Sequence, residues 1–331
     1  MIRADLERAC RLLCQLQDAI RAAVLRVQRR APTRLGRVAA VTAADTIYVV
    51  DRITEEVILT WFEQNWPRRR PVELVMEGLE DHGSVTFPRG TPVERTVWKC
   101  LIDPIDGTRG LMHDKRSAWS LAALAPQRGT KTDLGDIVVA AMTELPGSKA
   151  GAADQLSAVR GRGLHAWRFD LRTGRRKRFY PRPSRAADVA HGFASFVKPL
   201  PEGKAWLAAK EEELWRRLGV AAGRGGRPVF DDQYISTGGQ LYELLAGRDR
   251  FVADLRPLAF ARLRLRSALP CHPYDICTAL LAREAGCVIE APDGRPLRAP
   301  LDTTSPVAWV GYANATLARR IRPVLRQVFK I

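Results

Sequence analysis

Hydrophobic residues near the N-terminus recur every three or four positions, the spacing that gathers them on one face of an α-helix. They predict one long amphipathic helix over residues 2–30, followed by Pro32. The same spacing predicts a second helix over residues 43–66, which Pro67 ends. Residues 78–95 are rich in glycine, proline and charge and therefore predict a loop.

Short apolar runs along the rest of the chain predict strands, which alternate with helices from about residue 190. The predicted strands cover residues 72–76, 97–102, 119–125, 136–143, 158–160, 164–169, 194–197, 228–230, 251–253, 287–290 and 307–310. The predicted helices of the C-terminal half cover residues 203–218, 240–246, 274–285 and 315–329. A basic run at 172–185 is expected to be a solvated hairpin tip or the approach to a second half. This alternation favours a layered α/β fold over a helical bundle or a β-sandwich.

The length of 331 residues predicts two structural units of roughly 150 residues each. We expect an N-terminal α+β domain at 1–190 and a C-terminal α/β domain at 191–331. The chain is 46% hydrophobic and 27% charged, which is typical of a globular protein and argues against a disordered one.

Cysteine usage and hydropathy indicate the compartment. Six cysteines without a CxxC pair argue against a disulfide scaffold and against a zinc site. The N-terminus has no hydrophobic signal core, and no stretch approaches about 20 consecutive apolar residues. We therefore expect a cytoplasmic protein without membrane association.

The chain is strongly basic, with 53 lysines and arginines against 36 acidic residues and a formal net charge of +17. This charge favours anionic partners such as phosphate esters. The aromatic residues are scattered and form no RNA-recognition pattern, so a nucleic acid partner is not expected. Arg262, Arg264 and Arg266 alternate with leucines, which suits either a half-buried strand or an arginine-lined substrate mouth.

The chemistry is concentrated where the predicted strand at 97–102 ends. Asp103 and Asp106 follow it directly, and Gly107 can adopt the positive φ that lets backbone approach a ligand. A helix beginning near Thr108 would direct free N–H groups towards a phosphate. Two carboxylates beside an anion cradle suit Mg²⁺, which takes one or two carboxylates together with water and substrate phosphate. The alternative is a plain turn, because Asp, Pro and Gly are all turn residues.

Two further acidic residues favour the metal interpretation. Glu77 ends a short apolar strand, and Asp275 begins an apolar helix, the positions where ligand sites form in α/β folds. His113 and His272 lie nearby in sequence and are expected to have no site role. The sequence has no GxxxxGK[ST] loop, no GxGxxG after a strand, and no HExxH or GxSxG motif. P-loop hydrolysis, a Rossmann cofactor, zinc proteolysis and the common serine-hydrolase mechanism therefore lack support.

Several segments together resemble one known family. The run from Asp103 to Thr108 matches a DP(I/L)DGT signature, and Tyr274-Asp275 with Glu284-Ala-Gly286 is similar to a WDxAA…EAGG motif. Asp45, Asp51 and Glu55 are similar to a DxVTxxDxxxE helix pattern. In this order the matches span about residues 45–320. The chain thus resembles the inositol monophosphatase-like, Mg²⁺-dependent, lithium-sensitive phosphatases.

The resemblance implies a sugar-phosphatase-like αβαβα sandwich and a phosphoric monoester hydrolase with two or three Mg²⁺ ions. It also implies a small phosphorylated metabolite as substrate and a homodimer. The implied metal ligands are Glu77, Asp103, the Ile105 carbonyl, Asp106 and Asp275. The implied catalytic residues are Thr108, which positions the attacking water, Asp51, which supports it, Glu77 and Asp103. The implied substrate contacts are Gly107, Thr108, Arg109 and Asp275.

The chain departs from the family pattern at several positions. Gly78 stands where the family has a second Glu, Tyr48 where it has Thr, and Arg109 where it has Asn. The expected substrate is inositol monophosphate or a related small ester. A 3′(2′),5′-bisphosphate nucleotide or fructose 1,6-bisphosphate is the alternative within the same class. In another class, a catalytically weakened relative would bind polyanions or proteins.

Overall fold

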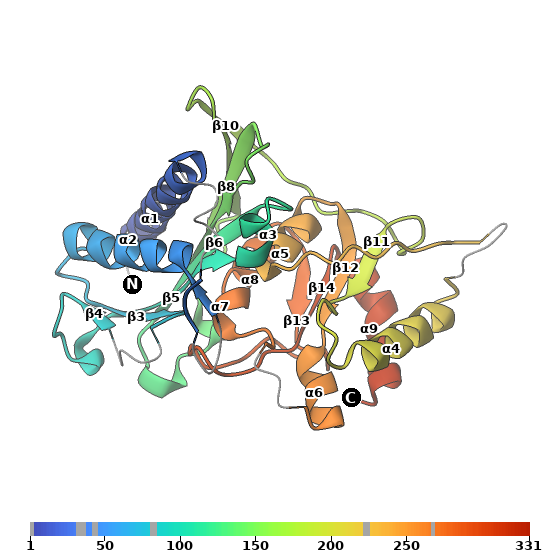
Figure 1. Ribbon diagram of the computed structural model, residues 1–331. Helices are drawn as coiled ribbons and strands as arrows, with labels where there is room; N and C mark the ends of the chain where they lie inside the picture. The colour runs from blue at the N-terminus through green and yellow to red at the C-terminus, as the bar shows by residue number, and fades with distance from the viewer. Residues whose placement is uncertain (1–2, 31–37, 42–45, 80–84, 221–225, 266–268) are drawn as a thin grey trace.

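The structure is a computed structural model that describes residues 3–30, 38–41, 46–79, 85–220, 226–265 and 269–331 (Figure 1). Its main feature is an eight-stranded sheet in the order β10-β9-β8-β7-β6-β5-β3-β4. Neighbouring strands are antiparallel except β3 and β5, which are parallel. The strands are β3 (Val72–Met76), β4 (Val85–Phe87), β5 (Trp98–Asp106), β6 (Ala118–Pro126), β7 (Val139–Leu145), β8 (Ala152–Val159), β9 (Leu164–Asp170) and β10 (Arg176–Phe179).

Helices α1 (Arg3–Arg30) and α2 (Val49–Asn65) cover one face of this sheet. The apolar face of α1 packs against the sheet, as the helical spacing predicts, and Leu13 and Ile20 at its centre are fully buried. The buried face also carries a polar residue, Gln17, whose amide donates to the carbonyls of Ser120 and Ala141 at 2.9 Å. These bonds satisfy a side chain that would otherwise destabilise the core.

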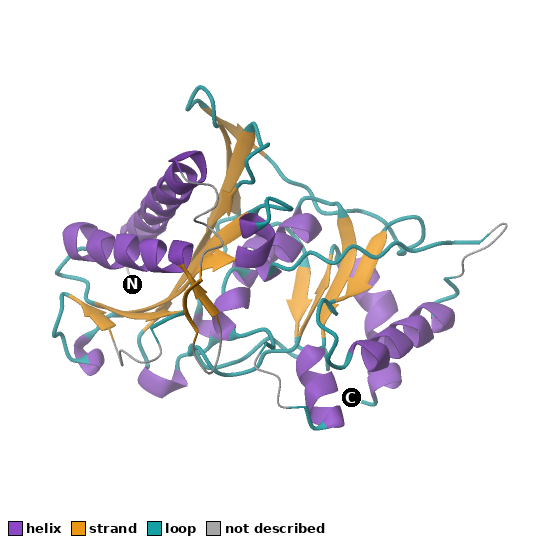
Figure 2. Ribbon diagram, viewed as in Figure 1, coloured by secondary structure: helices purple, strands orange, loops and turns teal. Residues whose placement is uncertain are grey.

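Two further helical layers and a second sheet complete the fold (Figure 2). Helices α5 (Thr237–Leu245), α7 (Pro273–Ile276) and α8 (Ala279–Glu284) pack between the two sheets. The second sheet has the order β11-β12-β14-β13. Its strands are β11 (Phe193–Phe196), β12 (Asp249–Asp254), β13 (Val288–Glu290) and β14 (Trp309–Tyr312). Helices α4 (Lys204–Arg217) and α9 (Ala315–Phe329) cover its outer face. The predicted αβαβα sandwich is confirmed.

The predicted boundary near residue 190 falls in the connection between the two sheets, after β10 and before β11. One hydrophobic cluster includes residues from both sides, such as Leu121 and Met142 with Phe251 and Leu281. We propose two subdomains, 1–190 and 191–331, that share this core. In the described part of the chain, no helix is long and apolar enough to cross a bilayer.

The secondary structure differs from the sequence prediction in the N-terminal half. Within the predicted helix at 43–66, β2 (Thr46–Tyr48) pairs with β1 (Val38–Val41) and α2 begins only at Val49. Thr, Ile and Tyr favour strands over helices, which accounts for this difference. Residues 43–45 lie outside the described residues. The predicted loop at 78–95 contains β4 and a short 3₁₀ helix, Val93–Arg95.

Differences in the C-terminal half have similar local causes. The single helix predicted over 274–285 is two, α7 and α8. The strand predicted at 228–230 reduces to one bridge between Phe230 and Phe193. The half-buried strand considered for the arginine–leucine run is wrong at Arg262 and Arg264, which are exposed at the end of α6 (Arg256–Leu263). Arg266 lies outside the described residues.

Candidate active site

Asp103 and Asp106 lie on β5, which continues beyond the predicted end at residue 102 because it pairs with β6 as far as Asp106. The pairing is irregular between the two aspartates. Asp103 is 1% exposed and Asp106 is 7% exposed, so both carboxylates are withdrawn from water. The backbone N–H of Ile105 donates to Asp103 Oδ1 at 3.0 Å and fixes the orientation of that carboxylate.

Asp275 joins these two aspartates from the other half of the chain. It lies in α7, which packs against β5 (Figure 1). The backbone N–H of His272 donates to Asp275 Oδ2 at 2.6 Å. Among the described residues, one carboxylate oxygen from each of Asp103, Asp106 and Asp275 lies within 4.8 Å of the others. The structure therefore brings together three of the predicted metal ligands.

The proximity of these carboxylates changes their protonation. Burial raises the pKa of Asp103 well above its usual range, and the charges of Glu77, Asp106 and Asp275 raise it further. Burial followed by the charge of Asp106 raises the pKa of Asp275 to about 8. Burial also raises the pKa of Asp106, to about 6, although hydrogen bonds to its carboxylate oppose the shift. A fully ionised cluster therefore requires a compensating cation.

The hydrogen bonds to Asp106 come from the start of α5. The hydroxyl of Ser236 donates to Asp106 Oδ2 at 2.8 Å, and the backbone N–H groups of Thr237 and Gly238 donate to the same carboxylate at 3.2 and 2.5 Å. A Cβ on Gly238 would lie 2.5 Å from the Leu121 side chain and 3.0 Å from Asp106 Oδ2. Only glycine allows α5 to approach the carboxylate this closely.

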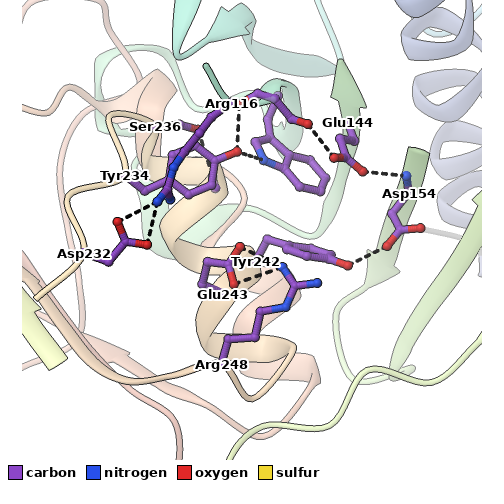
Figure 3. A network of polar contacts seen from close by, with 12 residues as sticks. Arg116, Glu144, Asp154, Asp232, Tyr234, Ser236, Tyr242, Glu243 and Arg248 are labelled. Atoms are coloured by element: carbon purple, nitrogen blue, oxygen red, sulfur yellow. Dashed lines mark hydrogen bonds and ion pairs between the residues drawn. The ribbon is translucent and has the colours of Figure 1, made fainter. Parts of the chain in front are cut away.

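Ser236 is held in place by a network of polar contacts just before it in the chain (Figure 3). The Tyr234 hydroxyl donates to the Ser117 carbonyl at 2.7 Å and accepts from Trp119 Nε1 at 3.1 Å, which ties the segment to β6. Arg116 forms two hydrogen bonds with Asp232 at 2.6 and 2.7 Å. Both contacts join the two halves of the chain next to the carboxylate cluster.

Gly107 and Thr108 connect β5 to α3 (Thr108–Met112), so the predicted helix start at Thr108 is confirmed. Gly107 has φ +93°, and a Cβ there would lie 3.0 Å from the Ile235 carbonyl oxygen and from Ser236 Cβ. Another residue type would be strained and would displace the segment that holds Asp106. The Thr108 hydroxyl donates to the Ile105 carbonyl at 2.8 Å.

The remaining predicted site residues lie around the cluster. Glu77 follows β3, and its charge reaches Asp103, but its carboxylate is not one of the three that lie within 4.8 Å of one another. Asp51 is half-buried in the first turn of α2, and Arg109 is exposed in α3. Gly78 has φ +87°, where the family's second Glu would be strained.

Two charged residues near the site were not predicted. Arg256 donates to both oxygens of Asp254, which is fully buried, and its Nη1 donates to the Leu269 carbonyl at 2.8 Å. The Arg256 charge lowers the pKa of Asp106 and Asp275 and so opposes the effect of burial. The only signal in the sequence was a basic residue two positions after an acidic one, which is too common to identify a site.

Solved structures with the same fold cover nearly the whole chain. The extragenic suppressor protein SuhB of Bartonella henselae is 18% identical with a TM-score of 0.62, and covers 98% of both chains. A fructose-1,6-bisphosphatase of Leishmania major is 15% identical with a TM-score of 0.66, covering 100% of this chain and 96% of its own. An inositol monophosphatase of Anabaena is 13% identical with a TM-score of 0.59, covering 98% and 97%. Because the sequence identities are this low, the structural similarity establishes only that the fold is shared.

The sequence itself gives the family. No curated protein matches it significantly. The sequence model of the Inositol monophosphatase family, however, matches residues 9–326, nearly the whole chain. Members of that family are phosphatases, which confirms the predicted enzyme class of phosphoric monoester hydrolase. The chain belongs to the inositol monophosphatase family.

Proposed function

We propose that this protein is a Mg²⁺-dependent phosphomonoesterase that acts on inositol monophosphate or a related small phosphate ester. The observation that carries the proposal is the convergence of Asp103, Asp106 and Asp275 beside the Gly107–Thr108 turn. Carboxylates that raise one another's pKa are costly in a folded protein. Their convergence from two separate segments of the chain favours a working metal site over a catalytically weakened binding module.

The donor set fits a hard divalent cation. Every candidate ligand is an oxygen, which suits Mg²⁺, and the buried carboxylates provide the negative charge it requires. When bound, Mg²⁺ lowers the pKa of a water molecule and stabilises charge on the leaving oxygen. We propose that two or three ions are held by Glu77, Asp103, the Ile105 carbonyl, Asp106 and Asp275.

The other residues would position water and substrate. The Thr108 hydroxyl donates a hydrogen bond to the Ile105 carbonyl, so its oxygen lone pairs are left to accept a hydrogen bond from an attacking water and orient it. Asp51 would support that water from α2. The backbone N–H groups of Gly107 and Thr108 would hold the phosphate, and the exposed Arg109 and the half-buried Asp275 would contact the substrate. Lithium sensitivity, a homodimer and a cytoplasmic location are further proposals from the family resemblance.

The substrate is identified by phosphate release from a panel of esters with Mg²⁺ or with EDTA. The panel holds inositol 1-phosphate, 3′-phosphoadenosine 5′-phosphate, fructose 1,6-bisphosphate, histidinol phosphate and glycerol 2-phosphate. We expect release from at least one ester, abolished by EDTA. No release from any ester, together with no Mg²⁺ binding by calorimetry, would contradict the proposal and favour the weakened binding module.

Ser236→Ala is expected to weaken Mg²⁺ binding about 10- to 100-fold, the usual effect of removing a group that orients a metal ligand. The variant loses the hydroxyl that donates to Asp106 Oδ2 at 2.8 Å. Titration calorimetry with Mg²⁺ alone measures the change. Ser148→Ala is the matched control, because it loses a similar 2.6 Å bond to Asp114 on an exposed loop. Equal affinities in the two variants would show that Ser236 does not orient the site.

A further inference from the structure

The basic run at 172–185 was expected to be a solvated hairpin tip or the approach to a second half, and its residues Arg176–Phe179 form β10, the outer edge of the large sheet. We define the basic ribbon as residues 164–180, the hairpin of β9 and β10. Figure 1 shows it projecting from the body, beyond the end of α1. Five cationic side chains in it are exposed. They are Arg172, Arg175, Arg176, Lys177 and Arg178.

Few carboxylates compensate this charge. The ion pairs found within the described residues include Arg168 with Asp154 but none of those five cations. Asp170, at the tip, accepts hydrogen bonds from the backbone N–H groups of Arg172 and Thr173 at 2.9 and 2.8 Å, and these bonds stabilise the turn. Burial raises the pKa of Asp18, on α1, and Arg176 lies near enough for its charge to oppose that shift. The ribbon therefore presents a net positive surface.

The cations on one face of the ribbon alternate with aromatic rings. Strand register places Arg178 opposite Trp167 and Arg176 opposite Phe169, so these four side chains share a face. The guanidinium of Arg176 lies 4.8 Å from the centre of the Trp167 ring, and that of Arg178 lies 5.1 Å from the Tyr180 ring. Tyr180 is 66% exposed. Guanidinium groups and aromatic faces together suit an anion that also carries flat rings.

The ribbon is too far from the carboxylate cluster to contact the same small substrate. Five strand intervals separate β10 from β5, which at about 4.8 Å each amount to roughly 24 Å. The surface also projects into solvent, whereas small-molecule sites are concave. Arg176 and Arg178 are two residues apart on a strand, which spaces their positions by about 6.6 Å. This spacing is comparable to that of successive phosphates in an extended single strand.

We propose that the basic ribbon binds single-stranded nucleic acid without sequence preference, with its arginines on phosphates and Trp167 and Tyr180 stacked against bases. The sequence did not predict a nucleic acid partner, because it has no pattern for sequence-specific RNA recognition. The proposed interaction forms no hydrogen bonds to the base edges and therefore does not depend on the base sequence. It is independent of the proposed phosphatase activity.

The test is fluorescence anisotropy of the full chain with a labelled 20-residue oligouridylate at several salt concentrations. The triple variant Arg172→Ser, Arg176→Thr, Arg178→Thr is expected to bind at least about tenfold more weakly at low salt. Each phosphate contact on a single strand contributes about 0.7 to the slope of log K against log salt, so the slope should fall by about 2. Tyr180→Ala should weaken binding about tenfold with the slope unchanged, since it removes stacking alone.

The matched control is Arg216→Ala, Arg262→Ala, Arg319→Ala, which removes three exposed arginines outside the ribbon. It should bind as the wild type does, and all variants should keep wild-type circular dichroism. Equal losses in the ribbon and control variants would overturn the proposal, because the binding would then follow net charge alone. No oligouridylate binding, with ribbon-dependent binding to phosphatidylserine vesicles, would overturn it in favour of a membrane surface.

Discussion

Replacing Asp103 by asparagine is expected to reduce turnover by about a thousandfold or more while the fold stays intact. Asp103 is the most enclosed carboxylate of the cluster, and three other acidic groups raise its pKa. Asparagine keeps the shape of the side chain, but it removes the negative charge that a shared cation requires. Turnover of the ester identified from the panel measures the loss.

The same variant separates a metal site from a merely structural carboxylate. Excess Mg²⁺ should raise the melting temperature of the wild type, because binding to the folded state alone contributes about 2.7 kcal/mol at 100 times Kd. Asp103→Asn should lose most of that increment, while Asp293→Asn, in a turn outside the cluster, should retain it. Wild-type turnover in the Asp103 variant would remove Asp103 from the proposed mechanism.

The metal-free protein is expected to lose stability as pH rises from about 5 to 8, by about 5 °C or more in melting temperature. The pKa of Asp106 is raised to about 6, that of Asp275 to about 8, and that of Asp103 well above its usual range. In the unfolded chain these groups ionise near pH 4. The folded state therefore holds more protons than the unfolded state across this window, and the free energy of unfolding falls as pH rises.

Excess Mg²⁺ distinguishes the cluster from other buried carboxyls. Burial also raises the pKa of Asp249, to about 7, and Asp249 lies outside the cluster, so its contribution should not respond to the ion. Because Mg²⁺ competes with the protons on the cluster, it should stabilise the protein more at pH 8 than at pH 5. Thermal melts in EDTA and in Mg²⁺ at both pH values provide the measurement. Equal stabilisation at the two values would contradict the prediction.

The sequence predicted the parts of the site whose chemistry is local. Asp103 to Thr108 is one continuous segment, so strand, glycine turn and helix start could be predicted together, and β5 and α3 confirm them. Asp275 was found because it begins an apolar helix. The family resemblance then placed both segments in one site, which spacing alone could not do.

The parts that were missed depend on tertiary contacts. Ser236 has an ordinary helix-capping pattern, and only the fold shows that its hydroxyl reaches Asp106. Arg256 is one of 44 arginines, and only its position beside Asp254 distinguishes it. The alternation of arginines with aromatic rings on the basic ribbon could likewise be recognised only from the pairing of β9 with β10. Residues 172–185 have no apolar face, so their sequence did not predict a strand there.

The separation of the aspartates along the chain has a consequence for biosynthesis. Asp103 and Asp106 leave the ribosome about 170 residues before Asp275, and Ser236 follows them by 130 residues. A nascent chain that ends before α7 holds two of the three clustered carboxylates and cannot complete the site. The proposed metal site is therefore completed only late in synthesis, and a truncated translation product that lacks the C-terminal half holds an incomplete ligand set.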